Sequence, residues 1–586
     1  MKMRITIISL LQSTISALSE DTTAYLTTSL ENVLQTQVET PAPVELETEG
    51  DIPDWLSGSF YRNGPGKFEF GEDQFKHMFD PMAIVQQIKI ENKKVSFNSR
   101  YIESRNFKAN SALNKIVYPE LGTGAEPDWI HFDENGEPLS EEEVQRNRLK
   151  FFMEDESKTD NTMVSLHNLC GNLVAFSETL SLHSIDHVTL ETLSSFSIEQ
   201  AANYPKDFIG MTQTPHGVFT HDGDFVNMMT GLLMEGLSDG VIRPPKVAYF
   251  MYKIRGARDS SKTIGQMLET IEFSEPTHNE KPFEMKIGYM HEGVLAGDYF
   301  LAILSSSVTD ITAVMANTKE GKPLMESIKH EPEREQEIRV FNLKTFSWEF
   351  ENSVPKLPAG IMLHTVNGRV VDETDKQIDF EFDGLWSGNP SVLSLFYLDA
   401  LRQKGPEFEE LRSEATPSGQ PTRINFTVKK GRKGSMVDMM FPGQETQDPP
   451  SLRPLVDNND PEWAGYSQGG VEFPTINPVT RGYGSKHFWG VGYAQVLGDR
   501  LYHTNSESGE RHVYLVEGYE PTEPVFVARP NENGEDDGLL ISAMLPIVQG
   551  KQGYVVILDA RDMSEVARAY LPAELNLATS FHTLWL

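Results

Sequence analysis

Four histidines share an unusual setting and are the residues best suited to chemistry. They are His216, His291, His364 and His582. Each of the first three follows an apolar stretch and precedes turn residues and a strand-like run, whereas the fourth lies in the uncharged segment 578–586 that ends the chain. Chain ends are usually polar and frayed, so an apolar end is expected to dock inside the fold and to carry its histidine with it.

Four neutral imidazoles without thiolates suit a borderline divalent metal such as iron(II), copper or zinc. Iron is favoured where coordination positions stay open for oxygen. Because the chain has one cysteine, Cys170, a multi-thiolate site and an intrachain disulfide are excluded. The alternative is that these four are unrelated core histidines, since the chain has 15 in total.

Metal-binding histidines need their second ring nitrogen tied to a partner, usually a carboxylate. Three glutamates lie in unusually apolar surroundings: Glu178, Glu472 and Glu523. A carboxylate buried among aromatic and branched side chains needs a polar partner. The sequence therefore predicts glutamate–histidine pairs around a metal ion.

Short strand-like runs, each introduced by a Gly-Asp or Gly-Asn type of turn, recur along the chain and must position these residues. Such units occupy 171–176, 222–229, 297–304, 498–503 and 550–558, and 82–97 is typical of a hairpin. Radial repetition of these units hides sheet edges, as in a β-propeller. We therefore predict an all-β fold, with two stacked β-sandwiches as the alternative. Insertions at 141–146, 244–252 and 408–412 are expected to form helices or loops on the rim.

The charge balance excludes some classes of partner. Lys and Arg number 51 against 86 Asp and Glu, a net charge of −35 over 586 residues. Such an acidic surface argues against nucleic acid and against simple electrostatic docking on anionic lipid. No apolar run of about 18 residues exists, so no membrane-spanning helix is expected. The first residues resemble a weak signal peptide whose apolar core is short and interrupted.

These features predict a flexible arm over residues 1–40 and a single domain over 41–586. The single cysteine fits a reducing compartment, so a cytoplasmic location is expected. A monomer is the expected oligomeric state.

Long, ordered motifs also match a known family. They are Trp55–Gly58, Arg62–Gly66, His77–Asp80, Arg100–Ile102, Leu121–Ala125, Glu472–Asn477, Asp536–Gly538 and Leu558–Arg568. In these motifs the chain resembles the carotenoid cleavage oxygenase family, which includes the retinal-pigment-epithelium retinoid isomerase and the animal β-carotene oxygenases. The resemblance runs from about Trp55 to the last residue.

The resemblance implies a seven-bladed β-propeller with a helical or loop cap over one face and Fe(2+) on the axis. Motif by motif, the iron ligands fall on His216, His291, His364 and His582, and the glutamates that bind ligand histidines fall on Glu178, Glu472 and Glu523. Val164 matches a small residue that flanks a vacant iron position.

Three departures from the family pattern mark a divergent member. Pro81 follows the His77 motif where glycine is usual, Gly217 follows the first ligand instead of proline, and Thr583 replaces a glycine after the last ligand. They bear on substrate choice more than on metal binding. From its turn chemistry His77 is expected to be structural. The same expectation, surface or structural, applies to His131, His167, His183, His187, His221, His278, His330, His487, His503 and His512.

The function implied by the resemblance is cleavage of a conjugated C=C bond of a carotenoid or apocarotenoid by O2, which gives two carbonyl products. No side chain is required as a general acid or base. The alternatives are a retinoid isomerohydrolase acting on retinyl esters, a stilbene-cleaving oxygenase using Tyr101 and Lys108, and a non-catalytic propeller binding module.

A lipophilic polyene substrate requires an apolar tunnel and a route out of a membrane. Candidate tunnel residues are Phe107, Tyr249, Phe250 and Phe300. Apolar loops around the tunnel mouth, including Tyr249 and Phe250, are expected to make a peripheral membrane contact.

Overall fold

The computed structural model describes residues 33–152, 158–236, 240, 243–279, 284–350, 354–388, 393, 396–402, 419–430, 449–456, 470–492, 498–548 and 550–586. Most of the expected arm lies outside these residues. Its last part is folded, because Val33 and Leu34 are buried in the core and strand β1 (Thr40–Glu45) follows. The predicted boundary at residue 40 is therefore too late, and residues 33–40 belong to the folded domain.

Among the described residues, seven antiparallel sheets have four or more strands, the number of blades that the resemblance implies. The first three comprise β8 (Ser165–Leu169), β9 (Asn172–Phe176), β10 (Ser181–Ile185) and β11 (Thr192–Ser197); β12 (Phe208–Gln213), β13 (Val218–Phe219), β14 (Phe225–Leu233), β15 (Lys246–Ile254), β16 (Ile271–Phe273) and β17 (Thr277–His278); and β19 (Val294–Ala296), β20 (Tyr299–Leu304), β23 (Glu337–Asn342) and β24 (Ser347–Glu349).

The next two sheets follow in chain order. They comprise β25 (Ile361–Glu373), β26 (Gln377–Ser387), β27 (Gln420–Lys429) and β28 (Ser451–Pro454), and then β29 (Val471–Thr475), β30 (His487–Gly492), β31 (Arg500–Asn505) and β32 (Arg511–Tyr514). Smaller sheets are formed by β4 (Glu69–Phe70) with β5 (Asp73–Gln74), and by β18 (Lys286–Gly288), β21 (Ser307–Asp310) and β22 (Ile328–His330).

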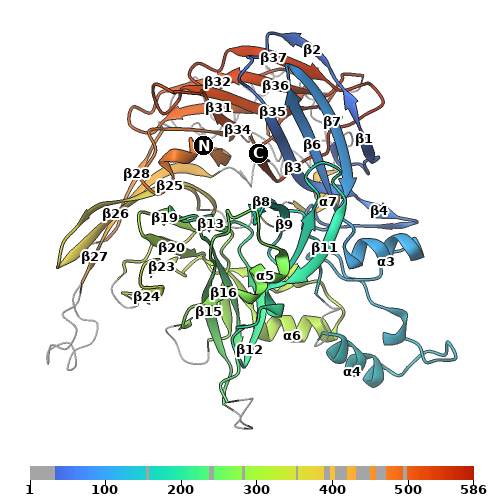
Figure 1. Cartoon of the computed structure of the whole chain (residues 1–586). Coiled ribbons are helices and arrows are strands. Elements are labelled where there is room, and N and C mark those ends of the chain that lie inside the picture. Colours follow the sequence, from blue (N-terminus) through green and yellow to red (C-terminus); the bar gives the residue numbers. More distant parts are fainter. Residues whose placement is uncertain are drawn as a thin grey trace, which may run out of the picture.

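The last two sheets mix strands from both ends of the chain. One holds β1, β3 (Gly58–Lys67), β6 (Met82–Glu91) and β7 (Lys94–Tyr101) with the terminal β38 (His582–Trp585); the other holds β2 (Glu47–Gly50) with β33 (Tyr519–Pro521), β34 (Val525–Ala528), β35 (Gly538–Pro546), β36 (Tyr554–Asp559) and β37 (Glu565–Tyr570). Figure 1 shows the early blue strands beside the late red ones. Each of these two sheets therefore contains strands from both ends of the chain, which connects the first sheet of the domain to the last.

The hairpin predicted at 82–97 is confirmed as β6 and β7. Its two turn residues, Asn92 and Lys93, have φ angles of 53° and 64°. A positive φ at both central positions matches the right-handed twist of the flanking strands.

One predicted insertion is wrong. Residues 244–252 were expected as a helix or loop, yet 246–254 form β15, which pairs with β14 along its whole length. All residues of β15 after the first are buried, and a strand covered on both faces reads as a continuous apolar run without alternation. The insertion at 141–146 is helical as predicted, and 408–412 lies outside the described residues.

Helices gather on one side of the molecule (Figure 1). They are α3 (Arg105–Leu113), α4 (Glu141–Phe152) and α6 (Ile311–Lys319), with the short η1 (Asp128–Ile130) and η4 (Leu324–Ser327); elsewhere lie α5 (Ile264–Glu269), α7 (Leu398–Leu401), η3 (Ile198–Gln200) and η7 (Pro478–Thr480). Arg148 of α4 donates to the carbonyl of Lys319 at the end of α6 at 2.8 Å. In the part of the chain that the structure describes, no helix has the length and apolar character needed to cross a bilayer.

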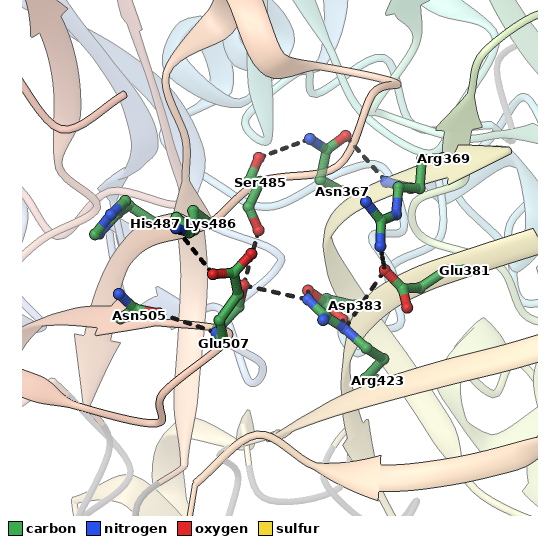
Figure 2. Close-up of polar contacts among 12 residues, drawn as sticks. Asn367, Arg369, Glu381, Asp383, Arg423, Ser485, Lys486, His487, Asn505 and Glu507 are labelled. Carbon is green, nitrogen blue, oxygen red and sulfur yellow. Dashed lines mark hydrogen bonds and ion pairs between the residues drawn. The ribbon is translucent and has the colours of Figure 1, made fainter. Parts of the chain in front are cut away.

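Polar side chains join neighbouring sheets (Figure 2). Arg423 of β27 binds both carboxylate oxygens of Asp383 at 2.8 Å and donates to Ser506 after β31. Asn367 of β25 donates to the Ser485 hydroxyl at 2.7 Å. Arg423 and Asp383 pair across neighbouring strands of one sheet, whereas the hydrogen bonds to Ser506 and Ser485 connect that sheet to the next.

Candidate metal centre

The four histidines predicted as ligands converge at one point. The Nε2 atoms of His216 and His291 are 3.2 Å apart, as are those of His364 and His582. One ring nitrogen from each of the four lies within 4.8 Å of the others. The positions come from four different sheet regions: the segment between β12 and β13, the segment between β18 and β19, strand β25, and the first residue of β38. This convergence excludes the alternative of unrelated core histidines.

The three predicted glutamates each bind the outer nitrogen of one of these rings. Nδ1 of His291 lies 2.8 Å from Glu178. Nδ1 of His364 lies 2.7 Å from Glu472, and that of His582 lies 3.0 Å from Glu523. A carboxylate only accepts hydrogen bonds, so in each pair Nδ1 holds the proton and Nε2 carries a bare lone pair.

This donor set fits a metal ion. The Nε2 lone pairs of His364 and His582 face one another at 3.2 Å and repel unless a cation lies between them. Imidazole nitrogens without a carboxylate ligand suit borderline first-row metals and are a poor match for Ca2+ or Mg2+, which take oxygen ligands.

Burial keeps the imidazoles of His216, His364 and His582 neutral, which metal binding requires. Desolvation, with the neighbouring histidines as a further cause, holds the pKa values of His216, His364 and His582 well below their usual range. Desolvation raises the pKa of Glu472 to about 8 and that of Glu523 to about 7. A cation among the four rings would favour the ionised form of both carboxylates.

The chain end is docked as the sequence predicted. Residues 582–585 pair antiparallel with Asn63 back to Phe60 of β3, and Phe581 is buried against Phe79. Buried Arg62 donates to the carbonyl of Ala578 at 2.7 Å. These contacts place His582 at the centre rather than on the surface.

The three departures from the family pattern leave the histidines in position. Gly217 leaves room for the ring of Phe225, because a Cβ there would lie 2.1 Å from that ring. The Thr583 hydroxyl donates to Glu523 at 2.9 Å, in addition to its backbone N–H at 2.5 Å. Pro81 accepts from the Asn161 amide at 2.9 Å. Thr583 therefore strengthens the hold on one of the three glutamates.

His77 is structural, as expected from its turn. Its ring is fully buried, donates from Nε2 to the carbonyl of Leu393 at 2.9 Å and accepts from the Phe79 N–H at Nδ1. Asp80 of the same motif accepts from the His77 N–H, from Gly122 and from the Thr123 hydroxyl.

A largely apolar cavity of about 630 Å³ opens onto three of the four rings, those of His291, His364 and His582. Val164, Phe79, Phe396 and Phe581 line it near the histidines, and residues of α4 and α6 line it farther out. Its wall includes Val164, whose carbonyl accepts from the N–H of His582 at 3.2 Å.

The predicted tunnel residues are wrong. Tyr249, Phe250 and Phe300 are buried in the cores between sheets, and Phe107 stacks on Tyr101; none of the four lines the cavity. Tyr249 and Phe250 belong to β15 and cannot form an exposed membrane loop. An apolar aromatic run alone does not distinguish a cavity wall from core packing.

Two residues beside the centre were not predicted from the sequence. The Tyr289 hydroxyl donates to Glu178 and lies 3.2 Å from Nδ1 of His291. Glu292 accepts from the backbone of Thr365 at 2.6 Å and lines a second, polar cavity of about 160 Å³ that also reaches the histidines. The signal for Tyr289 was its position two residues before a ligand, which places both side chains on one side of an extended segment.

Known proteins are similar in sequence to this chain over nearly its whole length. Residues 33–586 match the family model described as Retinal pigment epithelial membrane protein. The human protein named carotenoid-cleaving dioxygenase, mitochondrial, is 27% identical over 550 residues, covering 91% of this chain and 87% of that protein. The mouse β,β-carotene 15,15'-dioxygenase is 25% identical over 563 residues, covering 91% and 88%.

Solved structures share the fold. A cobalt-substituted apocarotenoid oxygenase from Synechocystis matches with a TM-score of 0.67 at 16% identity, covering 95% of this chain and 99% of that one. A chimera of that enzyme with RPE65 matches with a TM-score of 0.66 at 17% identity, covering 95% and 99%. This likeness confirms the predicted all-β propeller architecture.

Proposed function

This chain belongs to the retinal pigment epithelial membrane protein family, and from that premise we propose that it is an iron(II)-dependent dioxygenase that cleaves a conjugated C=C bond of a carotenoid or apocarotenoid with O2. The observation that carries the proposal is the convergence of four imidazole rings, three of which line the apolar cavity. Relatives named for carotenoid cleavage support the reaction class.

The proposed roles follow from the contacts. His216, His291, His364 and His582 hold Fe(2+), while Glu178, Glu472 and Glu523 fix the proton on Nδ1 of three of them. The ring of His216 has no carboxylate contact among the described residues. Val164 keeps a position beside the ion free of polar side chains.

Iron(II), when bound, supplies the redox chemistry that lets O2 react with an alkene. The protein orients the substrate and keeps water away from the metal centre. Apolar side chains such as Phe79 and Phe396 exclude water from the inner cavity, and the cavity aligns an extended polyene with one double bond against the three histidine rings that line it. Both oxygen atoms of O2 enter the products as two carbonyl groups.

The two residues considered for stilbene cleavage, Tyr101 and Lys108, lie away from the cavity. The Tyr101 hydroxyl donates to the carbonyl of Gln37 at 2.5 Å, and Lys108 pairs with Glu103. Neither residue lines the cavity. The retinoid isomerohydrolase alternative uses the same centre and is separated from the leading proposal by its independence of O2.

The test uses iron-loaded protein in detergent micelles, under air and under argon. β-Carotene, an apocarotenal, a retinyl ester and resveratrol are offered in turn, and products are separated by chromatography. Aldehydes that form only under air support the dioxygenase, and their chain lengths identify the bond. Retinol formed equally under argon would replace the proposal with the isomerohydrolase.

We also propose a peripheral membrane contact where the cavity meets the surface. Ile209, Met315 and Leu324 line the cavity and are 37%, 47% and 36% exposed. Exposed apolar side chains around a lipophilic binding site favour insertion into the lipid interface. The cytoplasmic location and the monomeric state remain predictions from the sequence.

Charged substitutions test this contact. Met315→Glu with Leu324→Glu should reduce co-sedimentation with phosphatidylcholine vesicles several-fold, because a charge resists burial in the interface. Val371→Glu, an equally exposed apolar site on β25, is the matched control. Equal sedimentation of all three proteins would contradict the contact.

A further inference from the structure

A second cluster of metal-binding side chains lies away from the four-histidine centre, between two neighbouring sheets. His487 begins β30 and His503 belongs to β31. Register pairs His503 with Trp489, so His487 and His503 are diagonal neighbours on the same face of the sheet. The loop between β34 and β35 brings Asp536 to this face.

The donor atoms of the three residues are close enough to share one ion. One donor atom from each lies within 4.8 Å of the others. Nδ1 of His487 is 2.8 Å from Nε2 of His503, and Nε2 of His487 is 4.0 Å from Asp536. In the free protein Nδ1 of His487 donates a hydrogen bond to Nε2 of His503 across the shorter distance.

The tautomer and the ring orientation of His503 suit a metal ligand. Its Nδ1 donates to the carbonyl of Arg561 at 3.0 Å, which leaves the lone pair on Nε2 directed at His487. Its ring is buried and stacks on Trp489 at 5.1 Å, so its orientation is fixed. This arrangement is the one by which proteins orient metal-binding histidines.

The loop that carries Asp536 is also fixed. The Glu535 carboxylate accepts from the backbone N–H groups of Lys486 and His487 at 3.0 and 2.9 Å. Asp537 binds Arg529 at 2.9 Å. Figure 2 shows His487 beside Lys486 with its ring directed away from Arg423 and Asp383, so the polar network of the neighbouring sheet does not use it.

The surrounding charge favours a cation. Arg561 is engaged by Asp559 at 2.9 Å, and its other guanidinium nitrogen is 3.9 Å from Asp537. With Asp536 and Asp562, the carboxylates here outnumber the guanidinium groups of Arg529 and Arg561. The cluster therefore lies in a locally negative field.

We propose that His487, His503 and Asp536 form a second metal site, for a divalent first-row transition-metal ion such as Zn2+. Two imidazoles and one carboxylate are a common zinc ligand set, and water completes the coordination. His487 then carries its proton on Nε2 in place of Nδ1, and the ion replaces the hydrogen bond between the rings. Because Asp536 lies in the loop between two strands of the next sheet, the ion would connect the two sheets.

The test measures Zn2+ binding by equilibrium dialysis and metal analysis of the iron-loaded full chain, with Asp536→Asn and Asp562→Asn beside the wild type. Asp562 is the matched control, because it carries the same charge in the same region and binds the backbone of Ser564. All three proteins keep the four-histidine centre, so the difference between them counts the second site alone, whichever metal fills the first.

The expected result is one additional Zn2+ per chain in the wild type and in Asp562→Asn, with at least tenfold weaker binding in Asp536→Asn. Addition of Ni2+ should also quench part of the tryptophan fluorescence in the first two proteins, through the ring of Trp489 that stacks on His503. Equal Zn2+ binding by wild type and Asp536→Asn, or no additional Zn2+ in the wild type, would overturn the site and leave a hydrogen-bonded contact between sheets.

Discussion

At the scale of residues, three carboxylates decide which nitrogen faces the centre in three of the four histidines. Glu472 is fully buried and accepts from Nδ1 of His364 with one oxygen and from the backbone of Gly419 with the other, at 2.7 and 2.9 Å. Loss of such an orienting contact typically costs 10- to 100-fold in metal affinity.

Glu472→Gln should therefore weaken iron binding by about 10- to 100-fold, because an amide can turn either its oxygen or its NH2 group toward the ring and no longer stabilises a positive centre. Iron per chain after competition with a chelator measures the effect. Glu520→Gln is the control: Glu520 lines the same cavity and burial raises its pKa to about 8 as well, but it accepts from Gly498 and contacts no histidine. Equal iron loss in both variants would contradict the orienting role.

The ligand histidines and their glutamates could be predicted because each stands in a short, recognisable motif. Tyr289 and Glu292 could not, because their roles depend on distant partners, Glu178 and Thr365, that only the fold brings near. The residues of the cavity wall could not be predicted either. Tyr249 and Phe300 lie in apolar, aromatic stretches of the kind that line a cavity, but they pack in the core.

At the scale of elements, the terminal strand β38 carries a ligand and is held by β3. Gly64 of β3 lies against the segment that leads into His582: a Cβ there would be 2.5 Å from the carbonyl oxygen of Thr579 and 2.7 Å from Cα of Ser580. Backbone atoms at those distances must move.

Gly64→Ala should lower both stability, by about 1–3 kcal/mol as for other overpacked sites, and iron occupancy, although it touches no ligand. Thermal unfolding and iron analysis check the two effects. Gly265→Ala in α5 is the control, because a Cβ there has only the Thr263 hydroxyl, at 3.9 Å, within reach. Unchanged iron occupancy in Gly64→Ala would show that β38 does not depend on this close packing.

Strand prediction succeeded where turns were explicit, as for β6 and β7. It failed for β15, whose buried run lacks the alternation that marks a half-exposed strand. The pairing of β3 with β38 could not be predicted from local pattern, because it joins residues more than 500 positions apart.

At the scale of the whole molecule, buried neutral histidines link folding to pH. Burial lowers the pKa of His77 to about 4, and its two ring nitrogens are satisfied only in the neutral form. Between pH 6.5 and 4 the unfolded chain therefore binds a proton at this site that the folded chain does not, so the contribution of His77 to stability is lost as the pH falls.

His77→Gln isolates this effect from the buried carboxylates, some of which act in the opposite direction. The stability of the wild type relative to the variant should fall by roughly 2 kcal/mol between pH 6.5 and pH 5. Urea unfolding at both pH values measures the difference. A stability difference that does not change with pH would mean that His77 is protonated equally in both states.

If a metal held by four histidines performs the cleavage, activity must follow the amount of iron bound to the chain. Metal-free protein is reconstituted to several iron levels under argon, and after admission of air the aldehyde formed from a carotenoid is plotted against iron per chain. We expect a straight line through the origin, with His364→Ala binding little iron and forming no product. Aldehyde from iron-free protein, or full activity in His364→Ala, would contradict it.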